Sequence, residues 1–495
     1  MRKGFRIQEN SPEIQLGYCS ITDIKFDPRS RDSVTRVLAG LQCAYQDKDF
    51  REEIITEIKR MVCRGDNFTE KGRKGLDCWS IFVFGMLRLV CNWSYDMLEN
   101  MANNHRDIRR LIGLNDWLDA DKKFSRTALH ENLSFLDAEG LLRISHKIVQ
   151  FSHKELGVSE LPLKGRCDSF VLESNVHFPT DLNLLFDCVR KCIELAVDLA
   201  VDFGLSGWRE HKSLMKKIKR VFTTLCKMRH SRSKDESKQL ARVEEIKSCC
   251  TDYLSRAEDI FVKVESLLSS LPPEAMKNQT LTEIMYFIKK GRLLCDQINR
   301  RLLNGEKISH AEKIFSVFEP YTEWIVKGKA GISQELGVRF CIVEDQLGFL
   351  LNQRMMYGEI DKEMVVALMK ETKTIYKTFC ACSFDKGFHS AKDCKGLTNR
   401  DYIELLGVTA YLPVQGRPNK EDKQRQSQKE FRENRKQHAA VESAINSLEH
   451  HGLNRCPDKG KKAFSRYAAA ACCGFNLHRL GSIILRQQLE LLQTA

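Results

Sequence analysis

The chain has 495 residues, 42% of them hydrophobic and 29% charged, a composition typical of a folded protein with a buried core. Its 28 glycines and 10 prolines are too few for a collagen-like or low-complexity chain. Lysine and arginine outnumber aspartate and glutamate by 79 to 66, so the net charge is +13 at pH 7. Such an excess favours a polyanionic partner, either nucleic acid or an anionic membrane surface.

No segment predicts a membrane span or a secretory signal. The most apolar run, residues 81–87, ends at Arg88 and is much shorter than the roughly 20 residues that cross a bilayer. The N-terminal sequence MRKGFRIQEN starts with basic residues but lacks the apolar stretch of a signal peptide. We therefore expect a cytoplasmic protein without membrane contacts, and nucleic acid becomes the leading polyanion.

The cysteines predict reduced thiols rather than disulfides. There are 19 of them, an odd number, and the sequence contains no Cys-x-x-Cys pair. Most closely spaced cysteines stand among apolar neighbours, where a thiol packs as a small hydrophobic side chain. A zinc site assembled from distant cysteines stays an alternative, although the usual ligand spacing is missing.

Residues 1–155 predict a helical domain. Trp79, Phe82 and Met86 recur at three- and four-residue steps, which is the stripe of an amphipathic or buried helix. Ser125 is a candidate N-cap for a later helix. Basic side chains on these short helices favour a helix-turn-helix-like DNA-binding unit; they are Arg106, Arg109, Arg110, Lys122 and Lys123. A helical packing domain with a solvated basic face is the alternative.

From residue 164 the pattern changes from helix to strand. Residues 167–172 form a short apolar run interrupted by one carboxylate, which is typical of a buried strand. Further strand-like runs lie at 338–343, 348–355, 379–385 and 405–414, and helices are expected at 362–376, 419–448 and 463–492. Strands and helices in this order predict a mixed α/β core.

A long helical segment interrupts this core between residues 182 and 309. Two apolar series follow heptad spacing there, on either side of a polar turn at 229–237. They are Leu214, Ile218, Val221, Leu225 and Met228, then Val243, Cys250, Leu254, Ala257, Phe261, Val264, Leu268 and Leu271. The first arm, residues 209–234, holds ten basic residues against one acid, Glu210. It either follows a DNA backbone, forms a solvated face of an intramolecular coiled coil, or supports dimerisation.

Three acids stand where strand and helix patterns can bring them together. Asp168 lies in the first strand-like run, Asp385 ends a later one, and Glu442 lies on the polar helix. Active residues of open α/β sheets gather at strand ends, and unpaired carboxylates close together need cations such as Mg²⁺ or Mn²⁺. Two such ions can bind the attacking and leaving oxygens of a phosphodiester. The alternative is that these acids are unrelated surface charges.

Five segments resemble DDE transposases of bacterial insertion sequences. Residues 168–181, DSFVLESNVHFPTD, are similar to the first-aspartate block of that family. Similar internal blocks are 314–331 (IFSVFEPYTEWIVKGKAG), 343–346 (VEDQ), 383–390 (SFDKGFHS) and 440–452 (AVESAINSLEHHG). The stretch 87–111, including MANNHR at 101–106, is similar to the helical domain that precedes the catalytic core there. The blocks are collinear, and the resemblance extends over residues 75–180 and 310–485.

The resemblance implies a domain plan around an RNase H-like core. Residues 1–155 would be the N-terminal helical, DNA-binding domain, and 160–181 with 310–475 the catalytic core. Residues 182–309 would be the helical insertion after the first core strand, and 476–495 the end of the C-terminal helix.

The resemblance also implies the site. Asp168, Asp385 and Glu442 would be the catalytic residues and the ligands of Mg²⁺ or Mn²⁺, with two ions during catalysis. Lys327, Lys329, Lys386 and His389 are the possible DNA contacts that the neighbouring blocks imply. Glu173, Glu344 and Asp345 are the alternative ligands, His177 is either a structural histidine or a base, and Glu449 stands where many relatives carry a basic residue.

The function that the resemblance implies is DNA transposition. Such an enzyme binds the terminal inverted repeats of its element, hydrolyses a phosphodiester at each end, and joins the freed 3′-OH to target DNA. It would act as a homodimer on double-stranded DNA, in the bacterial cytoplasm at the nucleoid. A non-catalytic DNA-binding derivative and an RNase H-like nuclease without strand transfer are the alternatives.

Overall fold

A computed structural model describes residues 18–62, 75–230, 236–272, 275, 278–326 and 334–494. The chain divides into two compact units. Unit 1 comprises residues 1–175 and 325–495, and unit 2 comprises residues 176–324. Each unit is described separately below.

Unit 1 is built on a mixed β-sheet with the strand order β2-β3-β1-β5-β6, in which β4 also pairs with β3 and β7 with β1. Its strands are β1 (Leu163–Ser174), β2 (Glu323–Val326), β3 (Gln334–Asp345), β4 (Leu350–Met356), β5 (Phe379–Phe384), β6 (Thr409–Tyr411) and β7 (Arg455–Cys456). β1 is central: it runs antiparallel to β3 and parallel to β5, and β5 runs parallel to β6. The predicted mixed α/β class is confirmed.

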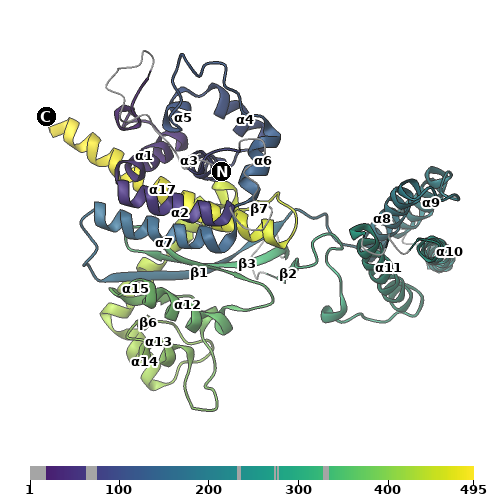
Figure 1. The fold of residues 1–495 in the computed structure, drawn as a ribbon. Helices are drawn as coiled ribbons and strands as arrows, with labels where there is room; N and C mark the ends of the chain where they lie inside the picture. The colour runs from purple at the N-terminus through teal and green to yellow at the C-terminus, as the bar shows by residue number, and fades with distance from the viewer. Residues whose placement is uncertain are drawn as a thin grey trace. The chain divides into compact units, whose positions relative to one another are not determined.

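Helices cover both faces of this sheet. On one side lie α1 (Ser33–Gln46), α2 (Lys48–Val62), α7 (Ala138–Glu155) and α17 (Lys461–Thr494), and on the other lie α12 (Asp361–Ile375), α13 (Asn399–Leu405), α14 (Lys420–Ser427) and α15 (Lys429–His438) (Figure 1). The remaining helices of unit 1 are α3 (Cys78–Val90), α4 (Tyr95–Asn104), α5 (Arg106–Leu111), α6 (Arg126–Ser134) and α16 (Ala440–Leu448). Single helical turns lie at Ile21–Asp23, Lys386–Phe388 and Glu449–Leu453.

The N-terminal helices begin where the sequence offers a capping side chain. The Ser125 hydroxyl accepts a hydrogen bond from the Ala128 amide and so starts α6, as predicted. Asp77 caps α3 in the same way, and every residue of α3 is buried. The predicted apolar stripe on this helix is therefore confirmed, although the helix is buried on all sides rather than on one face.

Two glycines allow α1 and α17 to cross at backbone contact. A Cβ atom on Gly481 would overlap the Arg36 carbonyl oxygen, and one on Gly40 would overlap that of Leu477. By length and composition α17 could also cross a membrane, but 72% of its most apolar window is buried inside the structure. That burial is what a core helix shows.

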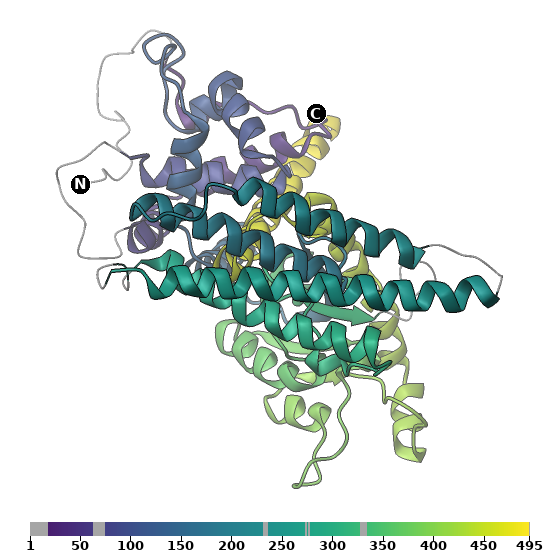
Figure 2. The ribbon, with the colours of Figure 1, turned by 90° about the vertical axis from the view of Figure 1, so that its right-hand side faces the viewer.

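Unit 2 is a bundle of α8 (Asp181–Asp202), α9 (His211–His230), α10 (Glu236–Ser269) and α11 (Gln279–Ile298), with short turns at Asn299–Leu303 and His310–Glu312. The four long helices run side by side (Figure 2). Most of the predicted heptad residues lie in its core or pack against it, including Ile218, Leu225, Cys250 and Phe261, whereas Val243 is exposed. The segment 182–309, predicted as a helical insertion, consists of helices joined by turns and contains no strand in its described part. Most of the predicted turn at 229–237 lies outside the described residues.

Several predicted elements differ from the observed ones. The expected helix at 419–448 is three helices, α14, α15 and α16, and the expected strand at 405–414 is only the short β6, preceded by α13. The predicted division at residue 476 falls inside α17, which is continuous from Lys461. Strands β2 and β7 were not predicted, because each is too short to carry a strand pattern.

Candidate functional site

Asp168 and Asp385 lie next to each other on two inner strands of unit 1's sheet, at the point where β5 ends. Cys167 of β1 is paired with Phe384, the last residue of β5, so the next residues along these parallel strands are the two aspartates. Residues in register on parallel strands share a face of the sheet. The structure therefore brings together the first two of the three predicted acids.

Asp168 is half-buried in this position. Burial, together with the nearby charges of Asp385 and Asp361, raises the pKa of Asp168 to about 6, although its Oδ1 accepts a 2.8 Å hydrogen bond from the Ser169 amide. Like charges in a partly desolvated site resist ionisation. A cation bound between these carboxylates would relieve the repulsion between their negative charges.

Asp385 is the more exposed of the pair and has basic partners on α15. Its Oδ1 lies 3.5 Å from His438 Nε2 and 3.4 Å from an Arg435 nitrogen. The contact with His438, followed by the charges of His438 and Arg435, lowers the pKa of Asp385. His438 is itself buried, and its Nδ1 lies 3.0 Å from the Ser383 hydroxyl. Asp385 thus carries a negative charge that is balanced by α15.

Glu442 lies on α16, which packs against β1 through its buried residues Val441, Ala444 and Leu448. The Glu442 side chain is exposed. Within the part of the chain that the structure describes, no three His, Cys, Asp or Glu side chains gather as a cation-binding group. The third predicted acid is therefore on a helix that contacts the strand of Asp168, but its carboxylate is not assembled with the other two.

A fourth acid, Asp361, was not predicted. It is the first residue of α12, and its Oδ1 is buried without a hydrogen-bond partner. Its charge acts on Asp168, and its Oδ2 would lie 3.5 Å from a Cβ atom on Gly387, two residues after Asp385. An acid in the first turn of a helix that follows a strand is a weak signal, because helix N-termini favour acids in any case.

The helix partners of Asp385 were also missed. Arg435 and His438 precede Glu442 by seven and four residues, a spacing that places all three on neighbouring turns of a continuous helix. In the structure this stretch is not one helix: α15 ends at His438 and α16 begins at Ala440. The spacing alone gave no reason to pair these residues with Asp385, because that contact depends on how α15 docks on β5.

The alternative ligands Glu344 and Asp345 have structural partners. Glu344 is buried and lies 3.1 Å from Arg166, while burial raises the pKa of Glu344 to about 7. Asp345 is fully buried, and its Oδ2 lies 2.8 Å from His153 Nε2. Both acids thus help to hold unit 1 together. Glu173 and Glu449 are half-buried.

The possible DNA contacts fall in different places. Lys386 is exposed in the turn after Asp385, and His389 is half-buried beside it. Burial, followed by the charge of Arg400, lowers the pKa of His389. Lys327 and Lys329 lie outside the described residues. In unit 2, the exposed His177 lies 3.4 Å from Asp187.

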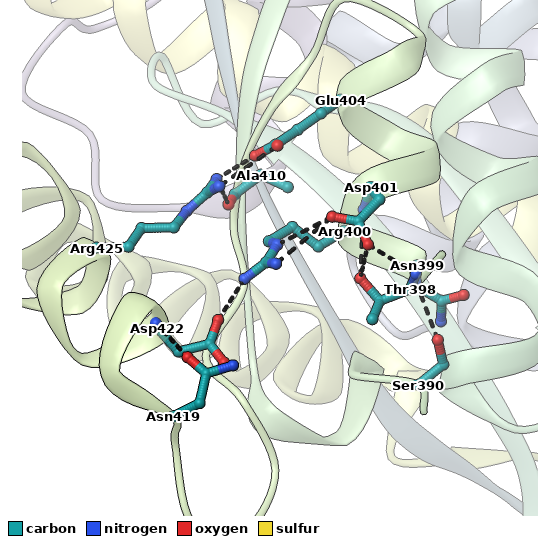
Figure 3. Close-up of polar contacts among 10 residues, drawn as sticks. All are labelled: Ser390, Thr398, Asn399, Arg400, Asp401, Glu404, Ala410, Asn419, Asp422 and Arg425. Carbon is teal, nitrogen blue, oxygen red and sulfur yellow. Dashed lines mark hydrogen bonds and ion pairs between the residues drawn. The ribbon is translucent and has the colours of Figure 1, made fainter. Parts of the chain in front are cut away.

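An arginine network fixes the chain that follows Asp385 (Figure 3). Arg400 of α13 lies 2.7 Å from Asp422 of α14, and Arg425 of α14 contacts both Glu404 and the Ala410 carbonyl. The Asn399 amide donates a hydrogen bond of 2.9 Å to the Ser390 hydroxyl. These contacts tie α13, α14 and β6 together and give the loop after β5 a defined path.

The predicted helix-turn-helix-like basic residues are partly occupied by contacts within the chain. Arg106 and Arg110 both pair with Asp116, and Arg109 donates hydrogen bonds to the carbonyls of Asp119 and Lys122. Arg106 stays largely exposed, with 69% of its side chain accessible. These arginines therefore shape the loop after α5, and the basic side chains that stay largely accessible are Arg106, Lys122 and Lys123.

Comparison with known proteins adds no family to this description. No protein-family model, no curated protein and no solved structure matches the chain.

The raised pKa of Asp168 predicts an unusual stability profile for the metal-free protein. The pKa of Asp168 is about 6 in the folded state against 3.8 when unfolded, so the group has no effect on stability below pH 3.8. As the pH rises from 3.8 to 6 it progressively destabilises the folded state, and above pH 6 this loss is complete. Replacing it by asparagine removes this loss. In denaturant titrations with a chelator present, the free energy of unfolding of Asp168→Asn is compared with that of the parent. The advantage of the variant should grow by on the order of 1–2 kcal/mol between pH 4.5 and 7.5. A difference that does not change with pH would contradict the assigned environment.

Proposed function

We propose that this protein is a DDE-type DNA transposase with an RNase H-like catalytic core in unit 1. The observation that carries the proposal is the position of Asp168 and Asp385, which the sequence predicted as catalytic and which stand side by side where β5 ends. Ligand and catalytic sites of open α/β sheets form at the carboxyl ends of parallel strands. The order of the resembling blocks along the chain is the second support.

The donor set fits a hard divalent cation. Asp168, Asp385 and Glu442 are the residues that would hold Mg²⁺ or Mn²⁺, and Asp361 offers a further carboxylate oxygen that has no hydrogen-bond partner. When bound, two such ions would activate the attacking oxygen and stabilise the departing 3′ oxygen of a phosphodiester. Closing the site requires Glu442 on α16 to approach the two aspartates.

Basic residues of the chain would hold a catalytic carboxylate before the cation binds and would contact the DNA. Arg435 and His438 hold the Asp385 carboxylate at the end of β5 and balance its charge before a cation is present. Lys386, exposed beside Asp385, is positioned to contact a phosphate of bound DNA. The remaining polypeptide would bind DNA through its positive charge, as a homodimer on the terminal inverted repeats and the target, in the bacterial cytoplasm.

A non-catalytic DNA-binding derivative of a transposase is the second candidate. The observation that favours it is that Asp385 is engaged by two basic side chains while Glu442 points to solvent. In such a derivative the aspartates would be neutralised permanently by α15. A nuclease without strand transfer shares every feature of the site and differs only in its product.

The test is incubation of the full chain with DNA taken from both sides of its coding region and Mg²⁺. A transposase should cut at short inverted repeats there and join the 3′ ends to a target plasmid. Cut but unjoined ends would indicate a nuclease, and binding without cutting would indicate the non-catalytic derivative.

A further inference from the structure

One face of α9 in unit 2 carries five basic side chains. At about 100° per residue, they fall within an arc of roughly 100° around the helix and span about 22 Å along it. They are Lys212, Lys216, Lys219, Arg220 and Lys227, and all five are exposed. Glu210, just before the helix, is the nearest acid in sequence.

The opposite face of α9 explains why the helix folds without using these charges. Ile218 and Leu225 are buried in the core of unit 2, and Val221 and Phe222 pack against it. The basic residues therefore contribute nothing to this packing. Their mutual repulsion opposes helix formation, since like charges four residues apart destabilise a helix.

Several basic residues elsewhere in unit 2 form ion pairs within the unit. Lys191 lies 3.0 Å from Glu194, Lys247 lies 3.1 Å from Glu244, and Arg256 lies 2.8 Å from Asp252. Arg292 of α11 pairs with both Glu258 and Glu265 of α10. By contrast, none of the five on α9 forms an ion pair with a residue in the described part of the chain. The five charges therefore stay uncompensated along one face of a single helix.

We propose that this face of α9 binds the phosphate backbone of double-stranded DNA, without reading its sequence. Duplex DNA presents one negative charge per about 1.7 Å of axis, so a 22 Å row of cations faces many phosphates at once. A membrane surface fits less well, because the described side chains of α9 include no exposed large apolar residue to insert. The proposal goes beyond the catalytic function and does not depend on the carboxylate site.

The test compares two triple variants of the full chain that lose the same charge. The first is Lys212→Gln, Lys216→Gln and Lys219→Gln on α9. The matched control is Lys191→Gln, Lys247→Gln and Arg256→Gln, whose cations are each paired within their own helix. Binding to a 30-base-pair duplex of arbitrary sequence is measured by fluorescence anisotropy over a range of salt concentrations, with a chelator present so that no cleavage occurs.

The α9 variant should lose about 3 units of the slope of log affinity against log salt, and on the order of 100-fold in affinity at 0.1 M salt. The control should keep the parental slope. Equal slopes for the two variants would overturn the proposal. It would also be overturned if the α9 variant lost binding only to vesicles containing 30% phosphatidylserine, or if the parent bound duplex RNA more tightly than DNA. Circular dichroism of both variants should match the parent, since all six side chains lie outside the core.

Discussion

Replacing Asp385 by alanine is expected to lower the rate of DNA cleavage by a thousandfold or more. A carboxylate that binds a catalytic cation supports most of the charge that develops in phosphodiester cleavage, so its loss removes several kcal/mol of transition-state stabilisation. DNA binding should stay intact or become slightly tighter, because one negative charge near the phosphates is removed. The measurement is cleavage of end-labelled inverted-repeat DNA in Mg²⁺.

The matched control for this variant is Glu433→Ala. Glu433 is an exposed acid on α15, the helix that contacts Asp385, and its ion pair with Lys429 is long at 3.9 Å. This change should leave cleavage within about twofold of the parent, since surface pairs contribute little. Parental cleavage by Asp385→Ala would refute the catalytic assignment of Asp385, and equal losses in both variants would point to a structural effect of α15.

Replacing Asp345 by alanine is expected to destabilise the protein by about 3–5 kcal/mol. Asp345 is fully buried; its Oδ2 faces His153, and its Oδ1 accepts hydrogen bonds from the Leu347 and Phe349 amides. Removing the carboxylate leaves these donors buried without a partner. Chemical denaturation of the full chain, followed by tryptophan fluorescence, measures the decrease in the free energy of unfolding.

Asp345→Asn is the control for this second change. Its amide oxygen can still accept from the two backbone amides, so it should lose less stability than the alanine variant. The pair of variants also tests Asp345 as an alternative metal ligand. If Asp345→Ala kept the parental denaturation midpoint but abolished cleavage, Asp345 would be a catalytic ligand rather than a structural residue.

The sequence predicted those parts of the fold that local patterns determine. β1, β3, β4 and β5 are apolar runs, and most of the bundle of unit 2 follows its heptads. β4 and β5 were predicted close to their observed bounds, whereas β1 and β3 are each 12 residues long and were predicted only over 167–172 and 338–343. α13 was missed although Thr398 and Asp401 form a capping box that marks its start. The sequence predicts one helix over the polar stretch 419–448, because no local signal marks where the helices end. Their ends depend on packing: Phe431 of α15 contacts Ala381 and Tyr411, whereas α16 packs on β1.

The site was predictable only in part, for a physical reason. Asp168 and Asp385 end up adjacent because strand register places them so, and register follows from apolar patterning. The partners of Asp385 on α15 and the nearby Asp361 depend on how α15 and α12 dock against the sheet, which no local pattern specifies. Glu442 was placed correctly on a helix, but its separation from the aspartates depends on the break between α15 and α16.

The central claim is that Asp168, Asp385 and Glu442 form one divalent-cation site, and Mn²⁺ binding tests it most directly. Electron paramagnetic resonance of free Mn²⁺ would be recorded with the full chain and duplex DNA, for the parent and for Asp168→Asn, Asp385→Asn and Glu442→Gln. We predict that the parent binds one or two ions and that each variant loses affinity by at least about tenfold, because each removes a charged ligand. Parental Mn²⁺ affinity in the Glu442→Gln variant, with its fold intact by circular dichroism, would contradict the claim.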